Sequence, residues 1–127
     1  MRDFRELSVW NKSHQLTLDC YGATKTFPRD ELYGLVSQIR RASASIGCNI
    51  AEGCGRSGNG DFQRFLQLAA GSASEVEYEL LLSHDLGYIP SETYVALSAQ
   101  TIEIKKMLTA LSRKVEIARF QDRGERI

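Results

Sequence analysis

Charged, hydroxyl and amide side chains recur at helical spacing in the stretch from residue 38 to residue 56, QIRRASASIGCNIAEGCGR. Intervals of three and four place six of them on one side of a helix: Gln38, Arg41, Ser45, Asn49, Glu52 and Arg56. Such a strip forms either a polar network that fixes how helices pack, or a site for a small ligand or phosphate. Because its acidic and basic members are matched, the pattern favours the network.

Residue types that support catalysis or metal binding are sparse and poorly placed. Helical di-iron sites use a glutamate three residues before a histidine, whereas Asn11 precedes His14 and Leu81 precedes His84. The cysteines form no CxxC pair, and two of them, Cys48 and Cys54, lie about 240° apart on a helix. The sequence therefore predicts no catalytic residue, no metal, no cofactor and no enzymatic activity, and the thiols are expected to be reduced.

Basic residues gather late in the chain, although Lys plus Arg and Asp plus Glu are both 16 and the net charge is zero. The group consists of Lys105, Lys106, Arg113, Lys114, Arg119, Arg123 and Arg126. One interpretation is a solvent-exposed face whose positive charges interact favourably with the negative, C-terminal end of the helix dipole. The other is a phosphate-binding patch formed by Lys105, Lys106, Arg113 and Lys114, which repetition in a ring would multiply. The residues alone favour the solvent-exposed face.

Apolar periodicity predicts four helices that position these side chains, at about 8–26, 31–54, 61–86 and 91–118. The expected fold class is all-α, an antiparallel up-down-up-down four-helix bundle within one domain over 1–127. Helix 91–118 has the clearest seam: Tyr94, Leu97, Thr101, Ile104, Leu108, Leu111, Val115 and Ala118. Residues 119–127 are polar and are expected to fray. The glycine-rich stretch 53–60 lacks the strand and the GK[ST] ending of a phosphate-binding loop, so a connection is expected there.

Helices 31–54 and 61–86 carry a second strip of small and apolar residues behind the core face. Its members are Ala44, Gly47, Ala51, Leu68, Gly71 and Leu82. A lone chain would expose this strip, so we expect a closed homo-oligomer. Glu75 falls within the strip and is expected to pair with Arg40 or Arg41.

Membrane insertion and export are not expected from the sequence. No apolar run reaches the ~18 residues of a membrane-spanning helix, and the start, MRDFRELSVWNK, is too charged for a signal peptide. A cytoplasmic protein is expected.

Several motifs occur in an order that covers nearly the whole chain. They are FRELSVW at 4–10, FPRDELYGL at 27–35, QIRRASASI at 38–46, NIAEGCGR at 49–56, FQRFLQLAAGSASEVE at 62–77 and LGYI at 86–89. This set resembles the bacterial four-helix-bundle family named for proteins encoded in intervening sequences of 23S ribosomal RNA. The accessory variability determinant of diversity-generating retroelements is similar.

The resemblance implies an antiparallel four-helix bundle that assembles as a homopentamer, has a nucleic-acid-binding role and has no accepted enzymatic activity. The family motif covers Arg40, Arg41, Asn49, Glu52, Gly53, Arg56, Phe65, Gly71, Ser72 and Glu75. One departure is that Gly47 and Cys48 stand where the family has a proline and a small residue. We therefore expect a straighter helix 31–54.

Two functions follow as alternatives. The first is an accessory protein that binds RNA or DNA, and the resemblance makes the phosphate-binding patch about as strong an interpretation as the solvent-exposed face. The second is an oligomeric protein-interaction scaffold without direct nucleic-acid binding, docking on a reverse-transcriptase-like protein. They differ in whether basic side chains or apolar surface dominates the exposed ring.

Overall fold

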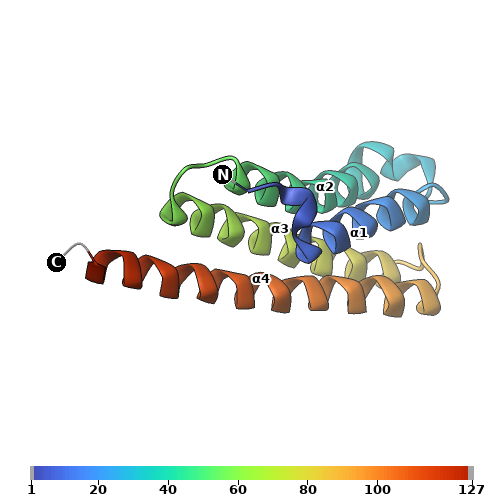
Figure 1. Cartoon of the computed structure of the whole chain (residues 1–127). Coiled ribbons are helices and arrows are strands. Elements are labelled where there is room, and N and C mark those ends of the chain that lie inside the picture. The colour runs from blue at the N-terminus through green and yellow to red at the C-terminus, as the bar shows by residue number, and fades with distance from the viewer. Residues whose placement is uncertain (1, 126–127) are drawn as a thin grey trace.

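Four α-helices packed around one core make up the part of the chain that the computed structural model describes, residues 2–125, with side chains through residue 122. The helices are α1 (Ser8–Thr24), α2 (Ser37–Cys54), α3 (Asn59–Asp85) and α4 (Ser91–Glu125). Each helix packs against the next along the chain, and α4 packs against α1. Figure 1 shows consecutive helices running in opposite directions. The all-α class predicted from the sequence is confirmed.

The predicted apolar faces form the core. Ile39, Ile46 and Ile50 of α2 and Ile104 of α4 are fully buried. Leu35, just before α2, and Ala42 and Ser43 of α2 are buried as well. These residues recur at intervals of three and four, which places them on the one stripe of the helix that faces the bundle interior.

The last helix is longer than predicted, because α4 continues to Glu125 instead of ending at residue 118. No proline interrupts it, and Gly124 is its only glycine. Its late turns are tied to α3, since Arg119 Nη1 donates a hydrogen bond to Gln63 Oε1 at 2.6 Å. The expected fraying of 119–125 is therefore not seen in the backbone; the side chains of Arg123 and Arg126 lie outside the described residues.

The entry to α2 is irregular. A 3₁₀ turn (Arg29–Glu31) leads into a π-helical turn (Leu32–Val36), and Gly34 departs from helical geometry inside it. The Glu31 carboxylate accepts a hydrogen bond from the Leu35 backbone N–H at 3.3 Å through Oε1, and one from the Tyr88 hydroxyl at 3.0 Å through Oε2. A Cβ at position 34 would lie 2.7 Å from Glu31 Oε1. The glycine thus leaves room for the carboxylate that links this turn to the α3–α4 connection.

α2 is a continuous α-helix through Gly47 and Cys48. The glycine allows close approach of α1, because a Cβ there would lie 3.3 Å from Trp10 Nε1. Trp10 packs against Phe4 of the short 3₁₀ turn Phe4–Glu6, with ring centroids 4.8 Å apart. The small residues Ala44, Gly47 and Ala51 therefore face an aromatic cluster of the same chain, across a groove of about 370 Å³.

None of the helices in the described part of the chain is both long and apolar enough to span a bilayer.

Candidate functional site

The predicted polar strip of α2 is divided among several local contacts. Asn49 Nδ2 donates to the backbone carbonyl of Ser45 at 2.9 Å and to its hydroxyl at 3.0 Å. The Ser45 hydroxyl lies 2.9 Å from that of Ser72 on α3. Glu52 and Arg56 form their own exposed ion pair at 2.7 Å, one turn apart. The strip therefore joins α2 to α3 through the Ser45–Ser72 hydroxyl pair, which Asn49 supports from α2, rather than through one charged network.

Arg40 is turned toward α1, and α1 supplies its partners. Its Nε donates to Thr24 Oγ1 at 2.9 Å, its Nη2 donates to the Tyr21 carbonyl at 3.3 Å, and its guanidinium lies 4.7 Å from the centre of the Tyr21 ring. Neither Arg40 nor Arg41 is among the ion pairs of the described residues. The predicted ion pair of Glu75 with one of these arginines is therefore not formed within the single chain.

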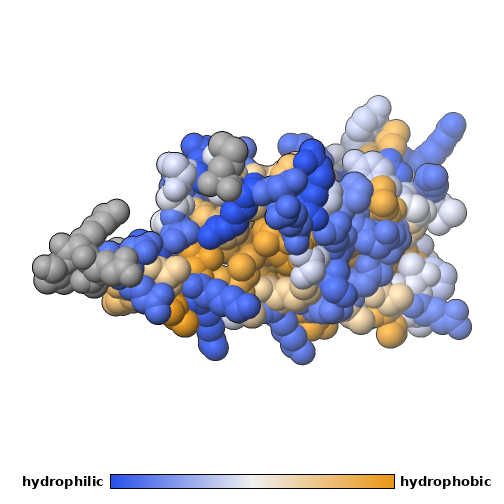
Figure 2. Space-filling view, in the orientation of Figure 1, coloured by the Kyte–Doolittle hydropathy of each residue, from blue (hydrophilic) through white to orange (hydrophobic). Residues whose placement is uncertain are grey.

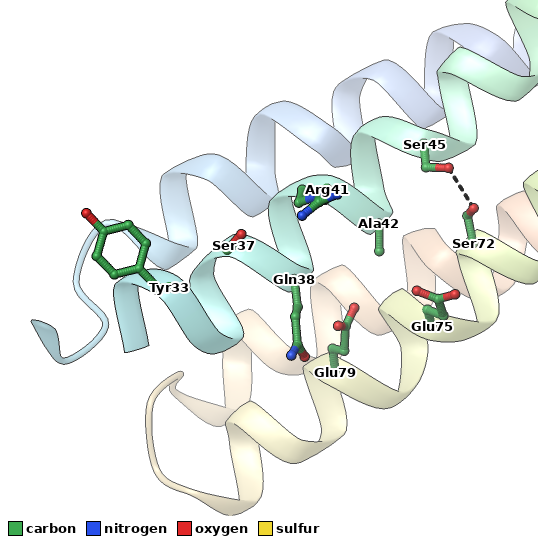
Figure 3. A pocket seen from close by; sticks show the side chains of 9 residues that line it. All are labelled: Tyr33, Ser37, Gln38, Arg41, Ala42, Ser45, Ser72, Glu75 and Glu79. Atoms are coloured by element: carbon green, nitrogen blue, oxygen red, sulfur yellow. Dashed lines mark hydrogen bonds between the residues drawn. The ribbon is translucent and has the colours of Figure 1, made fainter. Parts of the chain in front are cut away.

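Glu75 instead lines a polar groove of about 620 Å³ between α2 and α3 (Figure 3). The lining residues are Tyr33, Ser37, Gln38, Arg41, Ala42, Ser45, Ser72, Glu75 and Glu79. Figure 3 shows Gln38 extending from α2 toward α3, and Glu75 and Glu79 extending from α3 toward α2. Arg41, of the predicted network, therefore shares this groove with two carboxylates without an ion pair to either.

Glu79 is a groove residue that was not predicted from the sequence. Its side chain is buried, with 8% of the residue exposed, and no protein donor among the described residues hydrogen-bonds its Oε1. Burial, with a smaller contribution from the charge of Glu75, raises the pKa of Glu79 to about 7. A signal was present in the sequence, since Glu79 lies between the core positions Val76 and Leu80 and one turn after Glu75.

Three of the four predicted phosphate-binding cations line one shallow groove of about 430 Å³ on α3 and α4. Lys105 Nζ is neutralised there by Glu77 Oε1 at 3.1 Å. Lys106 and Arg113 are exposed in the same groove and form no ion pair or hydrogen bond among the described residues. Lys114 lies about 180° round the helix from Lys105 and does not line the groove.

Apolar side chains accompany the two free cations on the outer side of α4. Val95, Ile102, Lys106, Arg113 and Ile117 follow one another at intervals of seven and four, which places them on one side of the helix. The three apolar members are 63%, 40% and 59% exposed. We call this set the α4 outer stripe. It is neither purely cationic nor purely apolar.

A second cationic area, which was not predicted from the sequence, surrounds the start of α3. Arg2 Nη2 donates to Asn59 Oδ1 at 3.3 Å, and the Arg119 guanidinium lies against Gly60. One turn later, the Arg64 guanidinium lies 4.5 Å from the centre of the Phe65 ring. No sequence signal could have joined Arg2 to Arg119, because they come from opposite ends of the chain.

Metal-ligating and nucleophilic groups do not converge in the described part of the chain. No group of three or more His, Cys, Asp or Glu side chains is close enough there to hold a metal ion. The three cysteines are free thiols, and Cys48 alone is exposed. Burial raises the pKa of Cys20 to about 12, so this thiol stays protonated and unreactive.

Comparison with known proteins identifies the family. Residues 5–110 match the family described as 23S rRNA-intervening sequence protein. A search of curated proteins found no match. A crystal structure from Bacteroides thetaiotaomicron, of a protein of unknown function from the S23 ribosomal protein family, superimposes with a TM-score of 0.74. It is 29% identical, and the match covers 82% of this chain and 97% of that one. The chain thus belongs to the 23S rRNA-intervening sequence protein family.

Proposed function

We propose that this protein is a non-enzymatic, cytoplasmic accessory protein that binds RNA or DNA as a homo-oligomer. The observation that carries the proposal is the pair of exposed cations Lys106 and Arg113, which share one groove and have no acidic partner among the described residues. Unpaired cations can neutralise phosphates and release the counterions bound to them. The groove shows no base-stacking aromatic residue among its lining, so we expect little sequence preference.

Assembly is part of the proposal because one neutral chain offers few phosphate contacts. A ring repeats Lys106 and Arg113 in every protomer, and multivalent contact raises avidity without new chemistry. We propose five protomers, on the strength of the family resemblance. Figure 2 shows apolar surface on the face between the N-terminal segment and α4, which an assembly could cover.

The test compares two double variants by fluorescence anisotropy, with a labelled RNA and a labelled duplex, from low to moderate salt. Lys106→Gln/Arg113→Gln should weaken binding and flatten the dependence of log affinity on log salt. The slope on duplex DNA should change by roughly 0.9 for each phosphate that the variant no longer neutralises. Lys25→Gln/Arg29→Gln is the matched control, because both residues are exposed in the α1–α2 connection, do not line the groove and form no ion pair among the described residues.

Two results would contradict nucleic-acid binding at this groove. One is an intact oligomer that fails to bind either probe at low salt. The other is an equal effect of the two double variants, which would mean that only overall charge matters.

The α4 outer stripe supports the second candidate function, an oligomeric scaffold that docks a protein. Exposed Val95, Ile102 and Ile117 flank the same two cations, which is the pattern expected for a partner helix with acidic and apolar residues. We propose a reverse-transcriptase-like protein as that partner. Ile102→Ser/Ile117→Ser should then abolish co-purification with the partner and leave the salt slope for nucleic acid unchanged. If nucleic acid is the ligand instead, Lys106→Gln/Arg113→Gln should weaken binding of the labelled probes more than Ile102→Ser/Ile117→Ser does.

A further inference from the structure

We propose that the groove between α2 and α3 binds an organic cation, a guanidinium or primary ammonium group, between the carboxylates of Glu75 and Glu79. The inference is independent of the cationic groove on α4. Glu79 Oε1 is buried and accepts no hydrogen bond from the described residues. Folded proteins pair most of their buried polar groups, so this oxygen requires an explanation.

The burial of Glu79 distinguishes this site from an ordinary pair of surface acids. A buried carboxylate without a hydrogen-bond donor is costly, and the cost is removed by a proton or by a cation with N–H donors. Figure 3 shows the Glu79 side chain directed into the groove, with Glu75 one turn away on the same side of α3. Both carboxylates therefore line the same part of the groove and could contact one ligand.

The rest of the lining matches a donor-rich cation. A guanidinium has five N–H donors and no acceptor, so it requires several acceptors around it. The groove offers two carboxylates, the Gln38 amide oxygen and the hydroxyls of Ser37 and Ser72. A metal ion fits poorly, because only two carboxylates converge here and no third ligand from Asp, Glu, His or Cys joins them among the described residues.

Proton and cation should compete for Glu79. The charged and titratable groups near it are Glu75 on α3, Arg41 on α2, Tyr33 at the entry to α2, and Cys20 on α1, whose thiol stays neutral. Binding requires the ionised carboxylate, so affinity should rise with pH. With a pKa of about 7, the ionised fraction at pH 6 is about one tenth, and the affinity should be about tenfold weaker at pH 6 than at pH 8.

Two sources could supply the cation: a free small molecule, or a lysine or arginine of a second copy of this chain. The first arm of the experiment titrates the protein with agmatine at pH 6 and pH 8 by isothermal calorimetry. Butylurea, which is neutral, and magnesium chloride are the control probes. The second arm measures the mass of the protein alone by light scattering at both pH values.

The variants are Glu79→Gln and the matched control Glu92→Gln, an exposed glutamate in the first turn of α4. Both changes conserve shape, and the unfolding transition of each variant checks its fold. A free ligand is indicated if agmatine binds the wild type with the tenfold pH effect, and if Glu79→Gln lowers the affinity at least tenfold and removes that effect. A second copy is indicated if Glu79→Gln, and not Glu92→Gln, dissociates the oligomer at pH 8.

The proposal is overturned if agmatine binds no better than butylurea while Glu79→Gln leaves the mass unchanged. It is also overturned if agmatine binds the wild type better than butylurea does but binds Glu79→Gln equally tightly, or if magnesium binds the groove more tightly than agmatine.

Discussion

Arg40 and Arg41 are adjacent in the sequence and have different surroundings. Arg40 is half-buried and joins α2 to α1 through Thr24 and Tyr21, whereas Arg41 is exposed and lines the α2–α3 groove. Successive residues on a helix differ in direction by about 100°, so neighbours with the same charge can serve different interfaces. One has a structural role between helices, and the other is available to a ligand or partner.

A double-mutant cycle distinguishes these roles. Arg40→Ala and Thr24→Val should each destabilise the fold, and their coupling energy should be about 1–2 kcal/mol because the hydrogen bond joins a charged donor to a buried hydroxyl. Arg40→Ala and Glu75→Ala should instead be additive to within about 0.5 kcal/mol. Free energies of unfolding from urea titrations give both quantities. Coupling between Arg40 and Glu75 above about 1 kcal/mol would restore the ion pair predicted from the sequence.

Glu79 should make the stability of the free chain depend on pH. Its pKa is raised from 4.5 to about 7, so the native state holds this proton more tightly than the unfolded state does. The stabilisation is complete below about pH 4.5 and is lost as pH rises through about 7. The loss should be roughly 3 kcal/mol. Urea unfolding at pH 5, 6, 7 and 8 measures it; Glu79→Gln should flatten the profile and Glu92→Gln should not.

At the scale of the helices, hydrophobic periodicity was sufficient to predict four elements and the residues that they bury. Ile104, Leu108 and Val115 of the predicted seam follow the helical repeat and are buried. This works because an amphipathic helix encodes its buried face locally. The π-helical turn at the start of α2 could not be predicted, since it depends on Glu31 contacting Tyr88, which lies 57 residues away.

The same limit applies to the candidate site. The sequence correctly placed Lys106 and Arg113 on one flank of a helix, and it placed Lys105 near them. It could not show that Glu77 of α3 neutralises Lys105, because that contact depends on the register between two helices. Spacing defines the faces of one helix, whereas partners across helices require the packed structure.

Two glycines of α2 provide a test of helix packing. A Cβ at Gly53 would lie 2.9 Å from Phe65 Cβ and 3.0 Å from Phe62 Cδ1, both in the core-facing part of α3. Gly53→Ala should therefore cost about 1–3 kcal/mol. At Gly47 the neighbour is the edge of Trp10 at 3.3 Å, and the gain in helix propensity offsets the contact. Gly47→Ala should change the free energy of unfolding by less than about 1 kcal/mol; equal costs would contradict the packing described.

At the scale of the whole molecule, the helices differ in length. α1 has 17 residues, whereas α3 has 27 and α4 has 35. Figure 1 shows that α1 covers only part of the surface formed by α3 and α4, and Figure 2 shows apolar side chains near the uncovered part. The outer side of α3 is also open, with Leu68 and Tyr78 47% and 61% exposed. Exposed apolar area of this kind supports the proposed assembly.

Gly71 tests whether α3 forms part of that assembly. In the single chain, a Cβ built on Gly71 would have no atom within 4 Å apart from its neighbours and its own helix backbone, and the same is true of Gly22 on α1. Helix propensity alone predicts that Gly71→Gln and Gly22→Gln each stabilise an isolated chain, by roughly 0.5 kcal/mol. If α3 packs against a neighbouring protomer at Gly71, a glutamine side chain there must displace the partner helix. We expect Gly71→Gln to dissociate the oligomer in light scattering and Gly22→Gln to leave its mass unchanged. If both variants are more stable than the wild type and keep its mass, Gly71 faces solvent in the assembly. If the wild type itself has a mass of 14.2 kDa in solution, no assembly forms.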